Sequence, residues 1–307
     1  MNIKKINQMF FITVLVSLTA AFLPLNRLFP DYGARLLFSE ILLVAPGAAW
    51  IIAGKRNYMH TVRLKKIHVS TGILLFLFFI AVLPLMSLIN AISLLFVENT
   101  TTQTMAEIVT GHSFLGSLIV IALLPAIFEE SVYRGLFYNE YRQVSPIGGL
   151  LLSAFLFGIM HANWNQFSYA FVMGMVFCLI IEATDSILSS MILHFCINAS
   201  SVVILSLMDL LSEHFPQEFG EALELTGETE KLSFLSVLRT YLPMTVIGVA
   251  VAFVIYRQIA IKEGRWEVVK ALFVCGREKK AGIKLFSVPL IIGIGILLVL
   301  MVLNEIL

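Results

Sequence analysis

The residues with catalytic potential are a few ionisable side chains inside otherwise apolar stretches of sequence. Glu129 and Glu130 follow fifteen uncharged residues, and His161 and His194 each stand within a long apolar run. An acid at the centre of a membrane span costs about 2.5–3.5 kcal/mol on insertion scales, so such residues are candidates for function. Histidines and carboxylates supply what hydrolysis requires, namely a base for water and donors for an oxyanion.

Helical spacing predicts which of these side chains share a face. Neighbouring residues of a helix differ by about 100° in direction, so Glu129 and Glu130 are expected to face different partners. Glu130 and Arg134 are four residues apart and are expected to pair, and His194 and Asn198 share a face in the same way. Glu129 is thereby left free to point elsewhere.

Depth along the helices predicts where these faces meet. Measured from the expected cytoplasmic ends of their spans, Glu129, His161 and His194 lie about 20, 22 and 14 Å along their helices. Antiparallel neighbours would bring the three side chains into one water-filled pocket. Pro125, one turn before the acids, lacks a backbone donor and predicts a kink beside them. Taken singly, an acid or a histidine at a helix end also has a purely structural interpretation.

The composition places these residues in a membrane protein. The chain has 307 residues, of which 59% are hydrophobic and 13% charged, and its mean hydropathy is +0.91. A soluble domain would carry about 25% charged residues. The net charge of +1 offers no basic field for nucleic acid. Cys178, Cys196 and Cys275 form no CxxC pair and are interpreted as small hydrophobic residues.

The sequence therefore predicts an all-α fold, a polytopic transmembrane helical bundle of about nine spans with the active site inside the membrane. A span needs about 20 apolar residues, so the short fifth candidate is expected to be tilted or partly enclosed by protein. The nine candidates are Met9–Leu25, Arg35–Ala53, Gly72–Val97, Phe114–Asn139, Pro146–His161, Gln166–Ala183, Ser186–Leu211, Phe234–Tyr256 and Leu285–Asn304.

The connecting segments predict the orientation of the bundle. The connections at 55–66 and 257–284 are rich in lysine and arginine, whereas the connection at 213–231 is acidic. Positive segments stay in the cytoplasm, which places the N-terminus inside and the C-terminus outside. We expect an integral protein of a bacterial plasma membrane. The segment Arg257–Lys284 is either an amphipathic helix on the inner membrane surface or an ordinary connection.

The polar residues fall into three short patterns that resemble a known family. EExxxR is matched by Glu129, Glu130 and Arg134, FxxxH by Phe157 and His161, and HxxxN by His194 and Asn198. In this order and on separate spans, the patterns resemble the CPBP family, which contains the CAAX proteases and the bacteriocin-processing enzymes of the Abi type. The resemblance covers about residues 114–201. It implies N-terminal transmembrane helices at 1–113, a catalytic core at 114–211, and connections with further spans at 212–307.

The resemblance also implies roles for these residues. Glu129 would be the general base that activates water, assisted by His161, and His194 and Asn198 would stabilise the oxyanion. Three further residues would support the site, as an ion pair and an aromatic neighbour of the histidine: Glu130, Arg134 and Phe157.

Cofactor and partners follow from the same resemblance. Glu129, His161 and His194 would make a zinc site with an open position, but they also suit a metal-free glutamate mechanism, which we prefer because HExxH is absent from the sequence. The expected partners are the lipid bilayer and a membrane-associated peptide or protein substrate, whose identity stays open, as does the oligomeric state. The alternatives are a membrane scaffold that binds other proteins without catalysis and, less favoured, a transporter.

Overall fold

The computed structural model describes residues 3–21, 23–97, 101–215, 233–274 and 284–306. Within these residues every regular element is a helix. Most of the chain before the interior acids lies in α1 (Ile3–Ala21), α2 (Leu25–Leu28), α3 (Tyr32–Ala53), α4 (Tyr58–Val62), α5 (Val69–Ser93), α6 (Thr101–Gly111) and α7 (Phe114–Ser117).

The rest of the described chain contains two π-helical segments and eight further pieces with α-helical hydrogen bonds. They are η1 (Leu118–Leu123), α8 (Leu124–Glu130), η2 (Ser131–Tyr138), α9 (Asn139–Tyr141), α10 (Pro146–Ile159), α11 (Trp164–Thr184), α12 (Ile187–His214), α14 (Phe234–Lys262), α15 (Trp266–Val274) and α16 (Val288–Ile306).

Seven helices of the described chain are long and apolar enough to cross a membrane, which confirms a polytopic helical bundle. One of them, Phe114–Tyr141, runs without interruption from α7 to α9. The predicted number of about nine is reached only with α1 and α10, which are helices but do not belong to the seven. With 14 residues, α10 rises about 21 Å, less than the hydrocarbon core of a bilayer. Most of its residues are buried by neighbouring helices, as its short length predicts.

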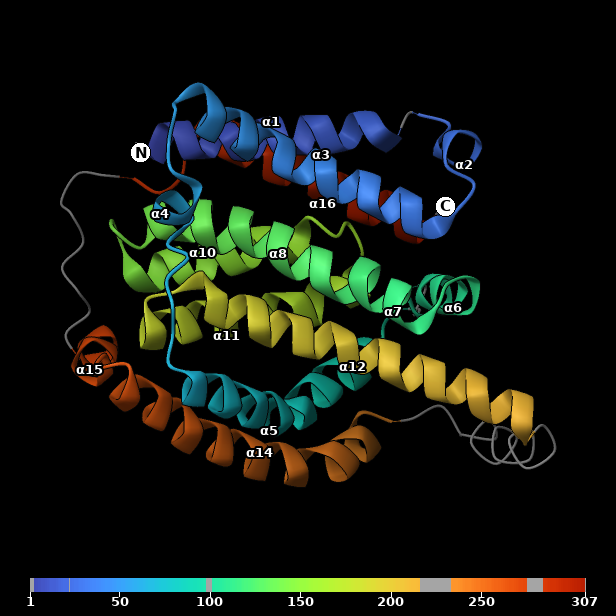
Figure 1. Cartoon of the computed structure of the whole chain (residues 1–307). Coiled ribbons are helices and arrows are strands. Elements are labelled where there is room, and N and C mark those ends of the chain that lie inside the picture. The colour runs from blue at the N-terminus through green and yellow to red at the C-terminus, as the bar shows by residue number, and fades with distance from the viewer. Residues whose placement is uncertain (1–2, 22, 98–100, 216–232, 275–283, 307) are drawn as a thin grey trace.

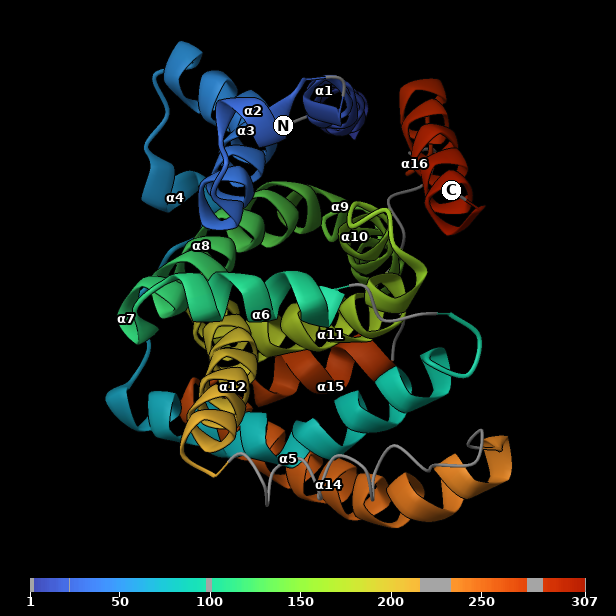
Figure 2. The same ribbon diagram turned by 90° about the vertical axis from the view of Figure 1, so that its right-hand side faces the viewer.

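The helices form three layers (Figure 1). One outer layer contains α1, α3 and α16, and the other contains α5, α14 and α15. The middle layer holds α8, α10, α11 and α12, and α10 packs closely on α11. Figure 2 shows that α16 stands at one side of this stack, beyond α1. The middle layer is therefore shielded on two faces.

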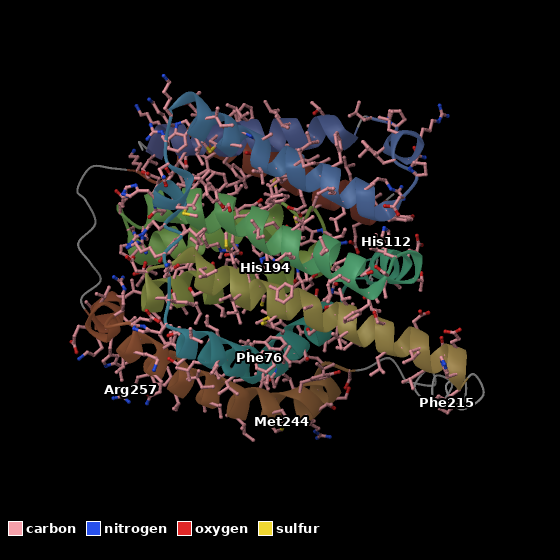
Figure 3. The ribbon with its side chains drawn as sticks, in the orientation of Figure 1. Phe76, His112, His194, Phe215, Met244 and Arg257 are labelled. Carbon is pink, nitrogen blue, oxygen red and sulfur yellow. The ribbon has the colours of Figure 1, made fainter. Side chains whose placement is uncertain are left out.

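Burial follows the same arrangement. The middle layer supplies fully buried residues such as Phe177 and Leu156, whereas the outer helices expose large apolar side chains such as Phe76 and Met244. Figure 3 shows His194 in the middle of the bundle, with Phe76 and Met244 on the outer layer. Apolar side chains on the outside are what a lipid environment requires, since lipid tails are as apolar as the side chains that face them.

Charged residues gather at one end of the bundle. Asp185 accepts from Arg63 and Lys65 of the connection before α5, and from Arg142 after α9. The N- and C-termini lie at opposite ends of the bundle (Figure 1). This agrees with an odd number of crossings, but which end faces the cytoplasm stays a prediction. The acidic residues 216–231 and the basic residues 275–283 lie outside the described part of the chain.

The segment Arg257–Lys284 does not form one continuous amphipathic helix in the described residues. The helix α14 continues to Lys262, and α15 follows as a separate short helix that packs on α11 and α14. Of the three cysteines, Cys178 is buried and Cys196 half-buried, both as free thiols, and Cys275 lies outside the described residues.

Candidate functional site

The span that carries the two glutamates changes its helical type twice. Its hydrogen bonds are π-helical in η1, α-helical in α8, and π-helical again in η2. Pro125 lies in the first turn of α8, directly after η1. Since proline has no backbone N–H, it cannot donate the hydrogen bond that would continue the π-helical pattern of η1. The structure thus has a change of helical type beside the acids, while the predicted kink stays a prediction. Insertions of this kind occur frequently at functional sites.

Glu130 and Arg134 form the ion pair that their spacing predicts. Nη1 of Arg134 donates to Oε1 of Glu130 at 2.8 Å, and both side chains are fully buried. The guanidinium lies 4.2 Å from the ring centre of Phe157 and 4.9 Å from that of Phe177. Gly174 makes room for it, since a Cβ there would lie 3.1 Å from Nη2 of Arg134. The arginine is thus fixed by one carboxylate and two aromatic faces.

His194 lies between the two glutamates. Its Nδ1 is 3.1 Å from Oε1 of Glu130, and its Nε2 is 3.6 Å from Oε2 of Glu129. The ring stacks on Phe177 with 5.1 Å between ring centres and an angle of 24°. The expectation that the adjacent glutamates face different partners is wrong in this respect, because both carboxylates reach one imidazole from its opposite nitrogens.

Glu129 differs from Glu130 in exposure and in neighbours. Its side chain keeps 14% of its surface accessible, whereas that of Glu130 keeps none. Besides His194, its carboxyl group interacts with Glu40 of α3 and with Tyr133 and Tyr169. Of the two adjacent acids, Glu129 is the one that water or a substrate can reach.

His161 stands just beyond the end of α10. Its Nδ1 is 2.9 Å from the carbonyl oxygen of Phe157, so in the neutral ring Nε2 is left as an acceptor. The next residue, Ala162, has the left-handed φ of 48° and turns the chain into α11. The carbonyl of Ala162 accepts from Nδ2 of Asn304 in α16 at 3.0 Å. The turn that carries His161 is therefore attached to a helix from another layer.

Phe157 connects His161 with the rest of the site. Its ring meets that of His161 edge to face at 5.1 Å and that of His194 at 5.9 Å, and the guanidinium of Arg134 lies over it. We call Glu129, Glu130, Arg134, Phe157, His161, Phe177 and His194 the interior cluster.

Asn198 lies one turn after His194 on α12. Its Nδ2 donates to the carbonyl oxygen of Ile121 in η1 at 3.1 Å, which joins α12 to the π-helical segment. An amide nitrogen has two hydrogens, so Nδ2 keeps one for a second acceptor. Asn198 can therefore hold the helices together and also donate to a substrate oxygen.

The residues proposed for zinc do not form a recognisable metal site. Among the residues that the structure describes, no group of three or more histidine, cysteine or acidic side chains is arranged to hold a metal ion. Glu129 and His194 are in contact with each other. The ring of Phe157 contacts both His161 and His194 and connects these two histidines. The geometry thus gives the metalloprotease alternative no support.

Two buried acids inside the expected spans were missed by the sequence analysis. Glu40 is the only ionisable residue between Arg35 and Lys55, and Glu182 stands near the end of α11. Both are buried. The signal for Glu40 was an isolated acid in an apolar run, the same signal that identified Glu129.

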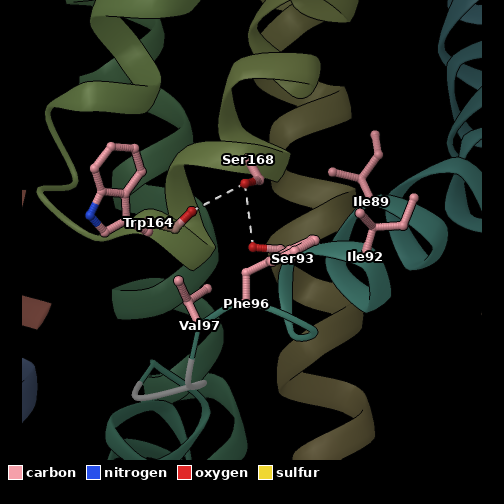
Figure 4. A pocket seen from close by; sticks show the side chains of 7 residues that line it. All are labelled: Ile89, Ile92, Ser93, Phe96, Val97, Trp164 and Ser168. Atoms are coloured by element: carbon pink, nitrogen blue, oxygen red, sulfur yellow. Dashed lines mark hydrogen bonds between the residues drawn. The ribbon is translucent and has the colours of Figure 1, made fainter. Parts of the chain in front are cut away.

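An apolar pocket of about 280 Å³ lies between the end of α5 and the start of α11 (Figure 4). Ser93 donates to Ser168, and Ser168 to the carbonyl oxygen of Trp164. Trp164 is three residues beyond His161, so the pocket adjoins the turn that carries this histidine. Its lining is formed by Ile89, Ile92, Ser93, Phe96, Val97, Trp164 and Ser168.

The fold and the interior cluster define an integral membrane protein of helical type with ionisable residues in its middle layer. Residues 111–200 match the family model described as type II CAAX prenyl endopeptidase Rce1-like. This segment contains every residue of the three motifs, and the match supports the predicted resemblance to the CAAX-type intramembrane proteases. A search of the curated proteins finds no match, and a search of the solved structures finds none either. The division into 1–113, 114–211 and 212–307 stays a prediction.

Proposed function

We propose that this protein is an intramembrane endopeptidase that hydrolyses a peptide bond in a membrane-associated protein or peptide. The observation that carries the proposal is the imidazole of His194 held between two carboxylates, one of them partly accessible. Such a group combines a base and a hydrogen-bond donor within reach of one reacting carbonyl. The match of residues 111–200 to a family of endopeptidases supports the same activity.

In the proposed reaction Glu129 is the general base. Its carboxylate takes one proton from a water molecule, and the water oxygen forms a bond to the carbonyl carbon of the substrate. The tetrahedral intermediate then breaks its carbon–nitrogen bond, and the proton held by Glu129 passes to the leaving nitrogen. His161 assists by accepting a hydrogen bond from the water through Nε2, since its Nδ1 is turned to the carbonyl of Phe157.

His194 and Asn198 stabilise the oxyanion in this proposal. With Nδ1 donating to Glu130, a protonated His194 presents its Nε2–H on the side of Glu129. The second hydrogen of Nδ2 of Asn198 completes the pair of donors. Donors that are fixed before the reaction stabilise the developing charge most effectively in a site of low polarity.

Glu130 and Arg134 act as the supporting pair. Arg134 holds the carboxylate of Glu130, and Glu130 holds Nδ1 of His194. The two aromatic rings around the guanidinium restrict its position further. The pair thereby fixes the direction of Nε2 without touching the substrate.

The substrate is expected to enter from the cytoplasmic side of the membrane, and a prenylated CAAX protein, a peptide leader and a membrane regulator all fit this class. The orientation rests on the basic residues that gather at one end of the bundle, namely Arg63, Lys65, Arg142 and Arg265. A reporter enzyme that works only outside the cytoplasm should therefore be active when it is fused after residue 306. The proposed location is a bacterial plasma membrane.

Comparing protein termini in cells tests the proposed function. Membranes that carry wild-type protein, Glu129→Ala, or the control Glu267→Gln at matched levels are compared for new N- and C-termini. Glu267 is exposed and lies on α15, so the control removes one carboxylate far from the site. New termini with wild type and control, and none with Glu129→Ala, are expected. Identical profiles in all three would favour the scaffold alternative.

Metal analysis of the purified protein separates the two proposed mechanisms. We expect no stoichiometric zinc and full activity after chelation, since the preferred mechanism uses Glu129 without a metal. One tightly bound zinc per chain, lost together with activity in His161→Ala, would replace this mechanism with a metal-dependent one.

A further inference from the structure

The backbone carbonyl of Ile121 in η1 holds the side chain of Asn198, one of the two donors proposed for the oxyanion. Nδ2 of Asn198 donates to this oxygen at 3.1 Å, across 77 positions of the sequence. In a regular α-helix the donor to this carbonyl would be the N–H of the fourth residue onward, which here is Pro125. Proline has no N–H, so the α-helical donor to Ile121 does not exist and a side chain from α12 donates instead.

The ring of Pro125 also affects the surroundings of this carbonyl. In an α-helix the ring of a proline clashes with the carbonyl four residues earlier, which belongs to Ile121. Prolines are tolerated in membrane-spanning helices where a π-helical turn and a donor from a neighbouring helix satisfy the freed backbone groups. Both are present here, since η1 precedes Pro125 directly and Asn198 supplies the donor.

Side-chain packing fixes η1 against α12 at the same place. Ile121 is 3% exposed, and Val202, one turn after Asn198 on α12, is fully buried. These two side chains form one apolar cluster with Ile108 and Val109 of α6, which lies across one end of the bundle (Figure 2). The carbonyl of Ile121 and the amide of Asn198 are therefore held opposite each other by packed side chains on the same two elements.

The bond determines how the amide of Asn198 is oriented. A carbonyl oxygen only accepts hydrogen bonds, so it selects Nδ2 and not Oδ1 as the atom that faces it. The amide group is planar, and fixing one N–H of Nδ2 leaves a single direction for the other. Without this acceptor the group could turn by half a rotation and exchange its oxygen and nitrogen. Its oxygen would then stand where a donor is required.

We propose that Pro125 is a positioning residue, which reserves the carbonyl of Ile121 for Asn198 by withholding a backbone N–H. The second N–H of Asn198 is thereby directed towards the oxyanion. This inference rests on the proposed function, in which Asn198 is one of the oxyanion donors. Pro125 acts only through Ile121 and Asn198. In Pro125→Ala the restored N–H competes for the carbonyl of Ile121, and the amide loses its fixed orientation.

Nuclear magnetic resonance tests the hydrogen bond without any substrate. The protein is labelled with heavy nitrogen in asparagine, and the side-chain signals of Asn198 are identified by their absence from Asn198→Ala. In Pro125→Ala the bonded proton of Nδ2 should shift towards the position of a free amide. The matched control is Pro243→Ala, since Pro243 lies inside α14 of the outer layer, and it should leave these signals unchanged. Unchanged signals in folded Pro125→Ala would overturn the inference, whether or not the protein is a protease.

The kinetic consequence is tested with a substrate identified from the terminal comparison. Complete loss of one oxyanion donor lowers kcat by about 10²–10³, so its partial misdirection in Pro125→Ala should lower kcat about tenfold. KM should stay within about twofold, because the interaction is made in the transition state. The melting temperature should stay equal or rise, since alanine is favoured over proline inside a helix. Unchanged kcat, or a loss of kcat that accompanies a lower melting temperature, would contradict the proposed role.

A double-mutant cycle separates this route from any other effect of the proline. Pro125→Ala should cause no further loss of kcat in the Asn198→Ala background, because its effect passes through that amide. Losses that multiply would show that Pro125 acts by another route and would reject the inference. Pro243→Ala should keep kcat and KM at their wild-type values. Failure of the proposed function is distinct, because wild type and Glu129→Ala would then give identical termini while the signals of Asn198 still respond to Pro125→Ala.

Discussion

Two groups of mostly buried or half-buried charges stand in this protein, and they differ in what surrounds them. At one end of the bundle, Glu182 meets two cations and Asp185 meets four, and these cations come from three connections between helices. We call this group the basic-end network, and its members are Arg63, Lys65, Arg142, Glu182, Asp185 and Arg265. In the interior cluster, Arg134 has one carboxylate and two aromatic faces.

The two groups differ in how many of their polar atoms have a hydrogen-bond partner. Nε and Nη2 of Arg134 and Oε2 of Glu130 have no hydrogen-bond partner from the described protein. In the basic-end network Glu182 accepts from Arg142 and Tyr138, and its backbone carbonyl accepts from Arg265. A well-paired network stabilises the fold, whereas polar groups left partly unpaired are typical of sites that must still bind something. Charge alone therefore does not distinguish the candidate site from the basic-end network, whereas the incompletely paired atoms of Arg134 and Glu130 do.

The largest expected effect comes from breaking the interior pair. Arg134→Ala leaves Glu130 buried without its cation, which should destabilise the protein by about 3–5 kcal/mol and abolish activity. Thermal unfolding in detergent and the yield of folded protein measure the loss. The double variant Glu130→Gln, Arg134→Met removes both charges and should recover most of the stability without the activity. A stable, active Arg134→Ala would contradict the role of the pair.

Glu129→Gln should separate chemistry from folding. Removal of a general base lowers the rate by about 10²–10⁴, and because Glu129 is partly accessible, the melting temperature should stay close to that of wild type. Cleavage assays and melting curves on the same preparation measure the two effects. Equal losses in Glu129→Gln and Glu130→Gln in both measurements would remove the distinction between the two acids.

The basic-end network should respond in the opposite way. Glu182→Gln takes one carboxylate from Arg142 and Arg265 and should cost about 1–3 kcal/mol of stability, while kcat stays near its wild-type value, because Glu182 lies at the charged end and outside the interior cluster. Activity should be measured at a temperature well below the melting point of the variant. A large loss of kcat in a folded Glu182→Gln protein would show that the network belongs to the site.

The smallest effect concerns a contact between α5 and the end of α14. Burial opposes the ionisation of Glu263, but hydrogen bonds from Thr71 and from the backbone and ring of His68 outweigh it and hold the pKa of Glu263 below its usual value. The contribution to stability is therefore present above the unfolded pKa of about 4.3. It is lost as pH falls through the lower folded value.

Acid titrations of stability test this contact. Wild type should lose melting temperature more steeply than Glu263→Gln in this acidic range, because the variant has no carboxylate to protonate. The two proteins should differ most near neutral pH and converge at low pH. Parallel curves throughout would mean that Glu263 contributes equally in both protonation states.

The spans and the main members of the interior cluster were predictable from the sequence because each has a local signal. Apolar runs of span length predict helices, and the spacing of Glu130 and Arg134 predicts their pairing. The contact of one imidazole with both Glu129 and Glu130 was not predictable, because it depends on the rotation of α12 relative to α8. The π-helical segments had only Pro125 as a sequence signal.

Glu40 was missed for a related reason. Its isolation in an apolar run was visible, but no motif includes it, and its partner is defined only by the packing of α3 on α8. Both helices are apolar almost all round, so periodicity does not indicate which face turns inward. Glu182 was missed as well, and only the structure shows which cations surround it.

The hydrogen bond from Asn304 to the carbonyl of Ala162 can form only late in the synthesis of the chain. The two residues are 142 positions apart in the chain, so at elongation rates of about 5–20 residues per second Asn304 is synthesised roughly 7–30 s after Ala162. Until then the turn that carries His161 is without the amide that holds it. The motif residues are thus all made well before their framework is complete, and catalytic competence should lag behind their insertion by this interval.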